Sequence, residues 1–187
     1  SGSGRGVNLF RDGTTTIAAT DNLAITGTVS GAGTGNGIRA NGGNVGTAIL
    51  MTAGGTATLK GIQMGNANNF DSAVYLSGFR VNATGDVTVQ AEAASSNSLA
   101  IHMNREAGSL NFYDDGWRMQ VRSSNGNVLI QSNQGAVVGA DINGGVTIAG
   151  RNVTFDNTGA GMTINGVPNA NGGSIDTTTG AIMLGSG

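Results

Sequence analysis

The chain contains no cysteine, and it has only one proline, one histidine, one lysine and one tryptophan among its 187 residues. The lack of cysteine excludes disulfides, thiol nucleophiles and thiolate metal sites. With one proline and no Gly-X-Y period, a collagen-like triple helix is excluded as well. No segment approaches the roughly 18 consecutive apolar residues of a membrane-spanning helix, so we expect no membrane insertion.

Charged residues are scarce, at 11% of the chain with a net charge of −2. This leaves no electrostatic basis for binding nucleic acid or an anionic membrane surface. Valine, isoleucine and leucine nevertheless recur at alternating positions, which is not typical of disordered chains. A cysteine-free chain rich in Asn, Thr, Ser and Gly is typical of extracellular bacterial proteins. We expect this one to be secreted or displayed on the bacterial cell surface.

Glycine is abundant, with 34 residues where an average chain has ~7%. We expect glycine and asparagine to supply tight corners that need a positive φ. Between those corners, short segments of alternating apolar and polar residues predict strands, and no window predicts a helix. The predicted strands are residues 23–26, 48–52, 57–61, 73–76, 79–81, 86–92, 99–103, 110–113, 117–122, 127–131, 146–149, 152–155, 162–164 and 181–184.

A longer pattern repeats along the chain. Residues 49–59 match residues 79–89, and residues 19–25 form a third, shorter copy. Each copy is an alternating segment, a corner of small residues and a second alternating segment. Such a unit cannot bury its apolar face alone, so it must stack on its neighbours in a solenoid.

A second repeated phrase separates inward from outward positions. It occurs at residues 37–41, 73–77 and 100–104. Because side chains alternate along a strand, we expect two inward columns in which apolar residues recur. These columns are Ile38, Val74, Ile101 and Ala40, Leu76, Met103. The intervening Arg39, Tyr75 and His102 are expected to point outward.

These repeats predict an all-β fold, a right-handed parallel β-helix, with handedness given by the crossover rule for parallel strands. In the C-terminal half, alternating segments are centred on Leu129, Thr147, Thr163 and Ile182, 16 to 19 residues apart. A coil of 18–25 residues then gives roughly eight coils. The alternative is a β-sandwich or barrel, but the Asn-Gly pairs fall at repeat corners and not at two-residue hairpin turns.

Three phrases resemble filamentous-haemagglutinin-type repeats: VNATGDVTV at 81–89, GVTIAGRNVT at 145–154 and VTFDNTGAG at 153–161. The resemblance covers most of residues 17–184. Such repeats belong to large exoproteins of bacterial two-partner secretion, including adhesins and contact-dependent-inhibition toxins. The resemblance implies a right-handed parallel β-helix stalk, exported through an outer-membrane secretion partner and used for adhesion or toxin presentation.

Residues 105–122 depart from the repeat and form an atypical aromatic and charged insertion. Aromatic rings that stack on sugars, beside carboxylates and guanidinium groups that hold hydroxyls, suit carbohydrate binding. The alternative is that Phe112 and Trp117 fill one wide coil. The sequence FYDDGWR at 112–118 is similar to phage tail fibres and tailspikes, which bind surface polysaccharide. The candidate contact residues are Tyr75, Tyr113, Asp114, Asp115, Trp117 and Arg118.

Catalytic chemistry finds little support. Glycoside hydrolysis needs two carboxyl groups about 5–9 Å apart across a bond, whereas the adjacent Asp114 and Asp115 are expected to point apart. Nothing marks a triad around His102. We therefore predict no enzyme activity, no metal and no cofactor. Asn82 and Asn152 match the glycosylation acceptor pattern, although stacked asparagine ladders at the corners are an alternative interpretation of such residues.

Residues 1–187 are thus expected to form one β-helix segment of a longer exoprotein, with residues 1–4 and 185–187 as linker or added ends. We expect a monomeric rod whose partner is a receptor or glycan on a host or neighbouring cell. Many weak contacts repeated along such a rod add through effective concentration.

Overall fold

The structure is a computed structural model, and it describes residues 4–10, 14–30, 35–41, 49–65, 72–94, 99–103, 119–139, 146–159, 162–165, 175–177 and 182–184. Within these ranges the chain forms 18 strands and no helix. Every strand pair is parallel. The sandwich alternative, which needs antiparallel hairpins, does not describe these residues.

The strands form three six-stranded sheets, which we call sheets A, B and C. Sheet A contains β1 (Val7–Phe10), β4 (Ile38–Asn41), β7 (Val74–Ser77), β10 (Leu99–Met103), β13 (Gly135–Gly139) and β16 (Met162–Asn165). Sheet B contains β2 (Thr15–Ala19), β5 (Ile49–Ala53), β8 (Phe79–Ala83), β11 (Met119–Ser123), β14 (Val146–Gly150) and β17 (Ile175–Thr177). Sheet C contains β3 (Leu23–Val29), β6 (Ala57–Gln63), β9 (Val87–Ala93), β12 (Val128–Ser132), β15 (Val153–Asn157) and β18 (Ile182–Leu184).

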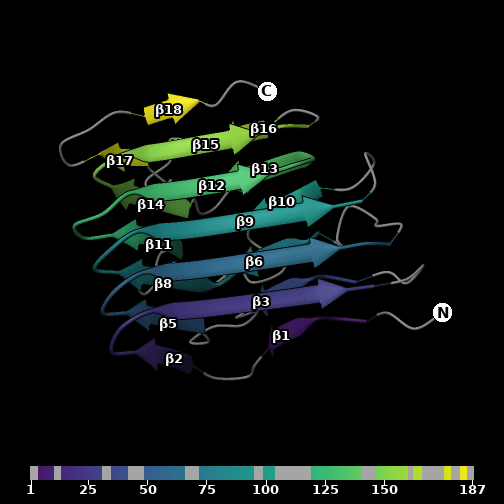
Figure 1. The fold of residues 1–187 in the computed structure, drawn as a ribbon, viewed down its shortest axis with the longest axis horizontal. Coiled ribbons are helices and arrows are strands. Elements are labelled where there is room, and N and C mark those ends of the chain that lie inside the picture. The colour runs from purple at the N-terminus through teal and green to yellow at the C-terminus, as the bar shows by residue number, and fades with distance from the viewer. Residues whose placement is uncertain are drawn as a thin grey trace.

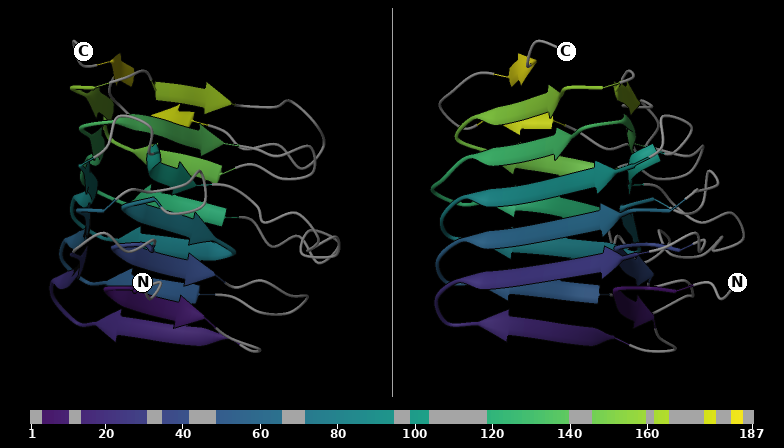
Figure 2. Two further views of the ribbon diagram at one scale, coloured as in Figure 1. Left: turned by 90° about the vertical axis from the view of Figure 1, so that its right-hand side faces the viewer. Right: turned by 45° about the vertical axis from the view of Figure 1, so that its right-hand side comes forward.

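The path of the chain is a right-handed coil. In Figure 1 the strands of sheet C run to the right across the front, those of sheet B return to the left behind them, and the chain rises from β1 to β18. Figure 2 shows the sheets as separate faces around a common interior. The predicted fold, an all-β right-handed parallel β-helix, is therefore confirmed.

The number of coils differs from the prediction. Neighbours within each sheet are three strands apart in sequence, so the described residues make six coils and not roughly eight. The four segments used to estimate the coil length lie in sheets C, B, A and C, centred on Leu129, Thr147, Thr163 and Ile182. Each spacing skips one strand, so it measures two of the three steps around a coil and not a whole coil. The repeat itself is longer and uneven: 41 residues separate Asp86 from Asn127, and 25 separate Asn127 from Asn152.

The strand register confirms the predicted repeats. Residues of β5 pair with residues of β8, so that Ile49 lies beside Phe79 and Met51 beside Val81. In sheet A, Ile38, Val74 and Ile101 share one inward column. All of these side chains are buried. The second predicted column, Ala40, Leu76 and Met103, is likewise in register and buried.

The core is continuous because each inward side chain lies on the inward side chain of the previous coil. The alternating burial of β6 and β9 places every second residue inside and leaves the others half-buried on the outer face. Each buried aliphatic side chain contributes roughly 1.5–3 kcal/mol relative to exposure. The stacked columns therefore supply the cohesion between coils that a single coil lacks.

Most corner glycines allow close packing of the backbone and do not supply a positive φ. Among the described residues only Gly35 and Gly78 have a positive φ, and the 60° of Gly78 makes the corner between β7 and β8. At Gly61, by contrast, an added Cβ would overlap the carbonyl oxygen of Ala73. The expected reason for the glycines is therefore wrong at most described positions. At Gly27 and Gly61 the backbone that leads into sheet A leaves no room for a side chain, and at Gly54 the corner of the adjacent coil does.

The orientation of β12, with one set of side chains inward and the other outward, can be tested with two adjacent residues. Ile130 is fully buried, whereas Leu129 lies on the outer face. We expect Ile130→Ala to lower the free energy of unfolding by about 2–5 kcal/mol through the cavity it leaves. Leu129→Ala should cost about 1 kcal/mol or less. Urea denaturation measures both, and equal losses would contradict the assigned orientation.

The close approach of the backbone can be tested at Gly61, which lies in β6 and pairs with Ala91 in the next coil. We expect Gly61→Ala to destabilise the fold by about 1–3 kcal/mol because the new methyl group meets backbone. The reverse change, Ala91→Gly, should cost only about 0.5–1 kcal/mol from added backbone entropy. Thermal and urea unfolding compare the two, and the idea fails if Gly61→Ala is neutral.

Candidate functional site

Most of the predicted contact residues cannot be placed. Tyr113, Asp114, Asp115, Trp117 and Arg118 lie outside the described residues. Of the atypical segment 105–122, only the beginning of β11 is described, and there the chain has returned to the repeat. These contact residues therefore remain predictions from the sequence.

Tyr75 is described, and it is buried. It occupies the outward column of sheet A as predicted, in register between Arg39 and His102. Its ring lies 5.5 Å from the Arg39 guanidinium carbon and makes an edge contact with His102, with ring centroids 5.2 Å apart. Only 4% of the residue is exposed. The structure therefore does not support Tyr75 as an exposed contact residue, because its neighbours in the column pack against its ring.

A column of polar residues follows the corner where sheet B passes into sheet C. Its members immediately precede the strands of sheet C: Asn22, Thr56, Asp86, Asn127 and Asn152. Short carboxylate, amide and hydroxyl side chains suit this position because they reach the backbone of the adjacent coil. We call this set the corner column.

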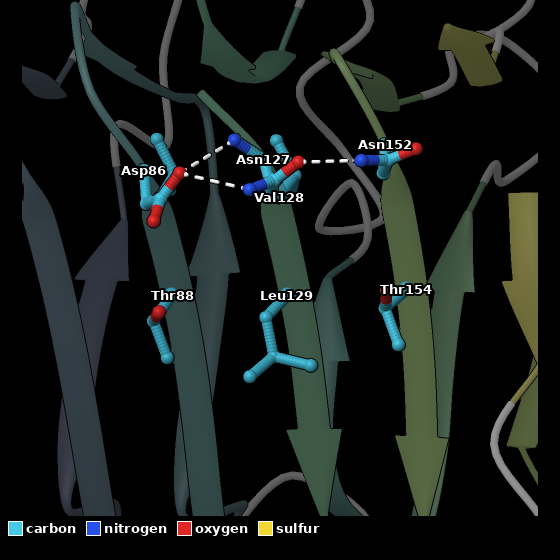
Figure 3. Close-up of a pocket in the computed structure, with 8 residues that line it drawn as sticks. Asp86, Thr88, Asn127, Val128, Leu129, Asn152 and Thr154 are labelled. Carbon is cyan, nitrogen blue, oxygen red and sulfur yellow. Dashed lines mark hydrogen bonds between the residues drawn. The ribbon is translucent and has the colours of Figure 1, made fainter. Parts of the chain in front are cut away.

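Asn127 links three coils within the corner column (Figure 3). Its backbone N–H and its side-chain amide both donate to Oδ1 of Asp86, at 2.7 and 3.2 Å. Its own Oδ1 accepts a hydrogen bond from Nδ2 of Asn152 at 2.7 Å. Farther down, Oδ1 of Asn22 accepts from the backbone N–H and the hydroxyl of Thr56, at 2.8 and 2.9 Å. Stacked polar ladders, the alternative interpretation of the asparagines, are confirmed at this corner.

The two glycosylation candidates occupy different environments. The Nδ2 atom of Asn152, which a glycan would modify, donates to Asn127 within the corner column. Asn82 is half-buried on the outer face of sheet B, and its Oδ1 atom is buried there. Glycosylation of either residue stays a prediction, and at Asn152 it competes with a hydrogen bond that joins two coils.

A shallow groove of about 350 Å³ begins at the corner column and crosses three strands of sheet C. Figure 3 shows its two rows of side chains. One row is the upper part of the corner column. The second row, two residues farther along each strand, is formed by Thr88, Leu129 and Thr154, which pair in register. The groove thus has a polar edge and a floor of methyl and isobutyl groups.

A second groove, of about 320 Å³, crosses β9 and β12 nearer their ends and reaches Thr158, which follows β15. Its walls include Gln90, Glu92, Gln131 and Asn133. Asn133 is fixed by the backbone of Ala93, which donates to its Oδ1 at 2.8 Å and accepts from its Nδ2 at 3.0 Å. We call the outer side of β6, β9, β12 and β15, with these two grooves on it, the sheet C face.

The sheet C face carries more negative than positive charge. Lys60 lies 2.7 Å from Glu92, with side chains 32% and 42% exposed, so this pair contributes only about 0–1 kcal/mol. Asp156 accepts a hydrogen bond from Gln131 at 2.9 Å. Asp86 is the third carboxylate. No described cation forms an ion pair with Asp86 or Asp156.

Two further features bear on the chemistry of the described residues. No group of three or more His, Asp or Glu side chains in these ranges is arranged to hold a metal ion. The same ranges contain no helix that is long and apolar enough to cross a membrane.

The sequence did not reveal the grooves because their residues come from coils of unequal length. A usable signal was nevertheless present. Each of the three strands begins with an Asx-Val pair, namely Asp86-Val87, Asn127-Val128 and Asn152-Val153. Aligning the chain on these pairs, without assuming a constant period, places Thr88, Leu129 and Thr154 in one row.

The corner column can be tested at its central residue. We expect Asn127→Ala to lower the free energy of unfolding by about 1–2 kcal/mol, because it removes the side-chain hydrogen bonds to both neighbouring coils. Asn125→Ala, an exposed change two residues earlier, serves as the control and should be nearly neutral. Urea denaturation of the two variants measures the difference. Similar losses of unfolding free energy would contradict a stabilising role for the corner column.

Comparison of the chain with protein-family models, with curated proteins and with solved structures gave no match.

Proposed function

We propose that the chain is a segment of a secreted bacterial β-helical adhesin or exoprotein stalk. Such a segment mediates attachment at a cell surface or presents a toxin, and it has no catalytic role of its own. The observation that carries the proposal is the contrast between the two faces of sheet C. The inward column Leu59, Val89 and Ile130 stays apolar from coil to coil, whereas the half-buried outward column changes from Lys60 to Gln90 to Gln131.

This contrast suits a stiff spacer with a variable surface. The inward columns and the parallel ladders hold each coil in register with the next, so the outward residues are free to differ without cost to the core. A rod of this kind presents several weak contacts at fixed spacings. Those contacts add through effective concentration when the rod meets a surface that carries many copies of its ligand.

The absence of catalysis is supported by the described acids. On the sheet C face, Glu92 pairs with Lys60 and also accepts from Gln90, while Asp156 accepts from Gln131. These contacts give the carboxylates structural partners. Each of the two grooves is lined by one described carboxylate, Asp86 in the first and Glu92 in the second, whereas glycoside hydrolysis needs two.

The partners we propose are a receptor or glycan on a host or neighbouring cell and, for export, an outer-membrane secretion partner. The first follows from the exposed polar surface, and the second from the resemblance of residues 81–89, 145–154 and 153–161 to exported repeats. Secretion or display at the bacterial surface is consistent with both.

A second candidate function is that of a phage tailspike-like protein. Such a protein binds surface polysaccharide, either with or without cleaving it. The grooves of the sheet C face favour this alternative, because they cross several coils as a polymer ligand does. Tailspikes assemble as trimers, whereas the adhesin proposal expects a monomer. Molecular mass therefore separates the two.

The test is to measure binding of the purified chain to a panel of glycans and cell surfaces, with light scattering to give its mass. We expect a monomer that binds, and we expect Trp117→Ala to weaken binding because it removes the only tryptophan of segment 105–122. Circular dichroism confirms that the variant is folded. A folded monomer that binds nothing contradicts the adhesive proposal, and a trimer that binds or cleaves polysaccharide favours the tailspike alternative.

A further inference from the structure

We propose that the sheet C face binds an uncharged, extended polysaccharide that lies across the third, fourth and fifth coils, with one hexose unit to each coil. This inference rests on the proposed adhesive function and names the ligand class. It places the contact on β9, β12 and β15, away from the segment 105–122 that the sequence singled out.

The spacing of the rows fits a sugar chain. Adjacent coils lie about 4.8 Å apart, which is close to the rise of one unit in an extended hexose chain, so successive units meet equivalent side chains. The two rows of the first groove are separated by two residues, or about 6.6 Å, along the strand. Three successive rings, one each over Thr88, Leu129 and Thr154, therefore reach the corner column with their hydroxyl groups.

The chemistry of the two rows is also complementary to a sugar. A hexose ring has an apolar face of C–H groups and a polar rim of hydroxyls. The floor row offers methyl groups and the isobutyl group of Leu129 to the C–H face. The polar row offers a carboxylate and amides, and a hydrogen bond to a carboxylate is roughly twice as strong as a neutral one. Of these, Asp86 uses only its Oδ1 in the bonds to Asn127.

The polar groups are held in place before any ligand arrives. Asn127 is bonded to both neighbouring coils, and Gln131 is fixed to Asp156 at 2.9 Å in the adjoining groove. Side chains that are already ordered lose little entropy on binding, which raises affinity without adding contacts. The volume of the first groove, about 350 Å³, is at the lower end of the roughly 300–1,000 Å³ typical of small-ligand sites.

Charge selects a neutral ligand. Asp86 lines the first groove and Glu92 the second, and no described lysine or arginine lines either. Beside the grooves, Asp156 accepts a hydrogen bond from Gln131, and Lys60 pairs with Glu92. A sulfated or uronic acid polymer would bring further negative charge within the Debye length of about 8 Å, and it would be repelled. Neutral hexose units avoid that repulsion and retain the hydrogen bonds.

The experiment is calorimetric titration of the chain with cello-oligosaccharides of increasing length, and with oligogalacturonides as the anionic counterpart. We expect neutral oligomers to bind, with an affinity that levels off once they span three coils, and the anionic series to bind at least about tenfold more weakly. Raising the salt concentration should leave neutral binding unchanged.

Two substitutions of the outward residue Leu129 are expected to change the affinity for neutral oligomers in opposite directions. Leu129→Asp should weaken binding at least about tenfold, whereas Leu129→Trp should strengthen it, since an indole ring stacks on the C–H face of a sugar. A misfolded variant does not gain affinity. Leu50→Asp and Leu50→Trp are the matched controls, because Leu50 is a half-buried outward leucine on sheet B, and neither should change the affinity.

The outcomes separate this inference from the proposed function. Three outcomes overturn the neutral-glycan site: unchanged affinity in both Leu129 variants, tighter binding of the anionic series, or binding of the neutral series that salt abolishes. If cells bind the chain but no neutral oligomer does, only this inference fails. If neither cells nor oligomers bind, the adhesive proposal fails with it.

Discussion

The register between one coil and the next is the constraint on which the rest of the structure depends. Three parallel ladders must form at once, and in each of them an inward residue must lie on an inward residue. A shift of one position in any sheet would turn a whole column to the other face. Val128 lies beside Val87, 41 residues earlier, and beside Val153, 25 residues later, so this alignment survives repeats of very different length.

The three corners respond to this constraint in different ways. The passage from sheet B to sheet C is always short: it comprises residues 20–22, 54–56, 84–86, 124–127 and 151–152. The passage from sheet A to sheet B ranges from Gly78 alone to residues 104–118. A short corner keeps equivalent residues beside one another in successive coils, which is why the hydrogen-bonded column forms there. The order of the corner column then extends to the rows of the sheet C face that follow it.

Features that depend on the two-residue alternation of a strand were predictable from the sequence. Features that depend on the lengths of the corners were not. The inward columns of sheet A were predictable because alternation alone decides the face of Ile38 or Met103. The number of coils was not predictable. Leu129, Thr147, Thr163 and Ile182 repeat at nearly even intervals, although each lies in a different sheet from the one before it. Burial of an outward residue was also unpredictable. The side chains stacked beside Tyr75 bury its ring. The sequence of one strand does not show which side chains the adjacent strands place beside it.

The same distinction bears on where a binding surface forms in such a fold. Residues 119–122, the described part of segment 105–122, belong to β11 and pair in register with β8 and β14, so that Val121 lies beside Val81. A contact that occurs once, such as the one predicted for Trp117, does not depend on such stacking. A contact that must recur at equal intervals needs the opposite, a face on which stacking fixes every side chain. The sheet C face meets that requirement because the corner that precedes it has nearly the same length in each coil, and a polymer is the class of ligand that uses equal intervals.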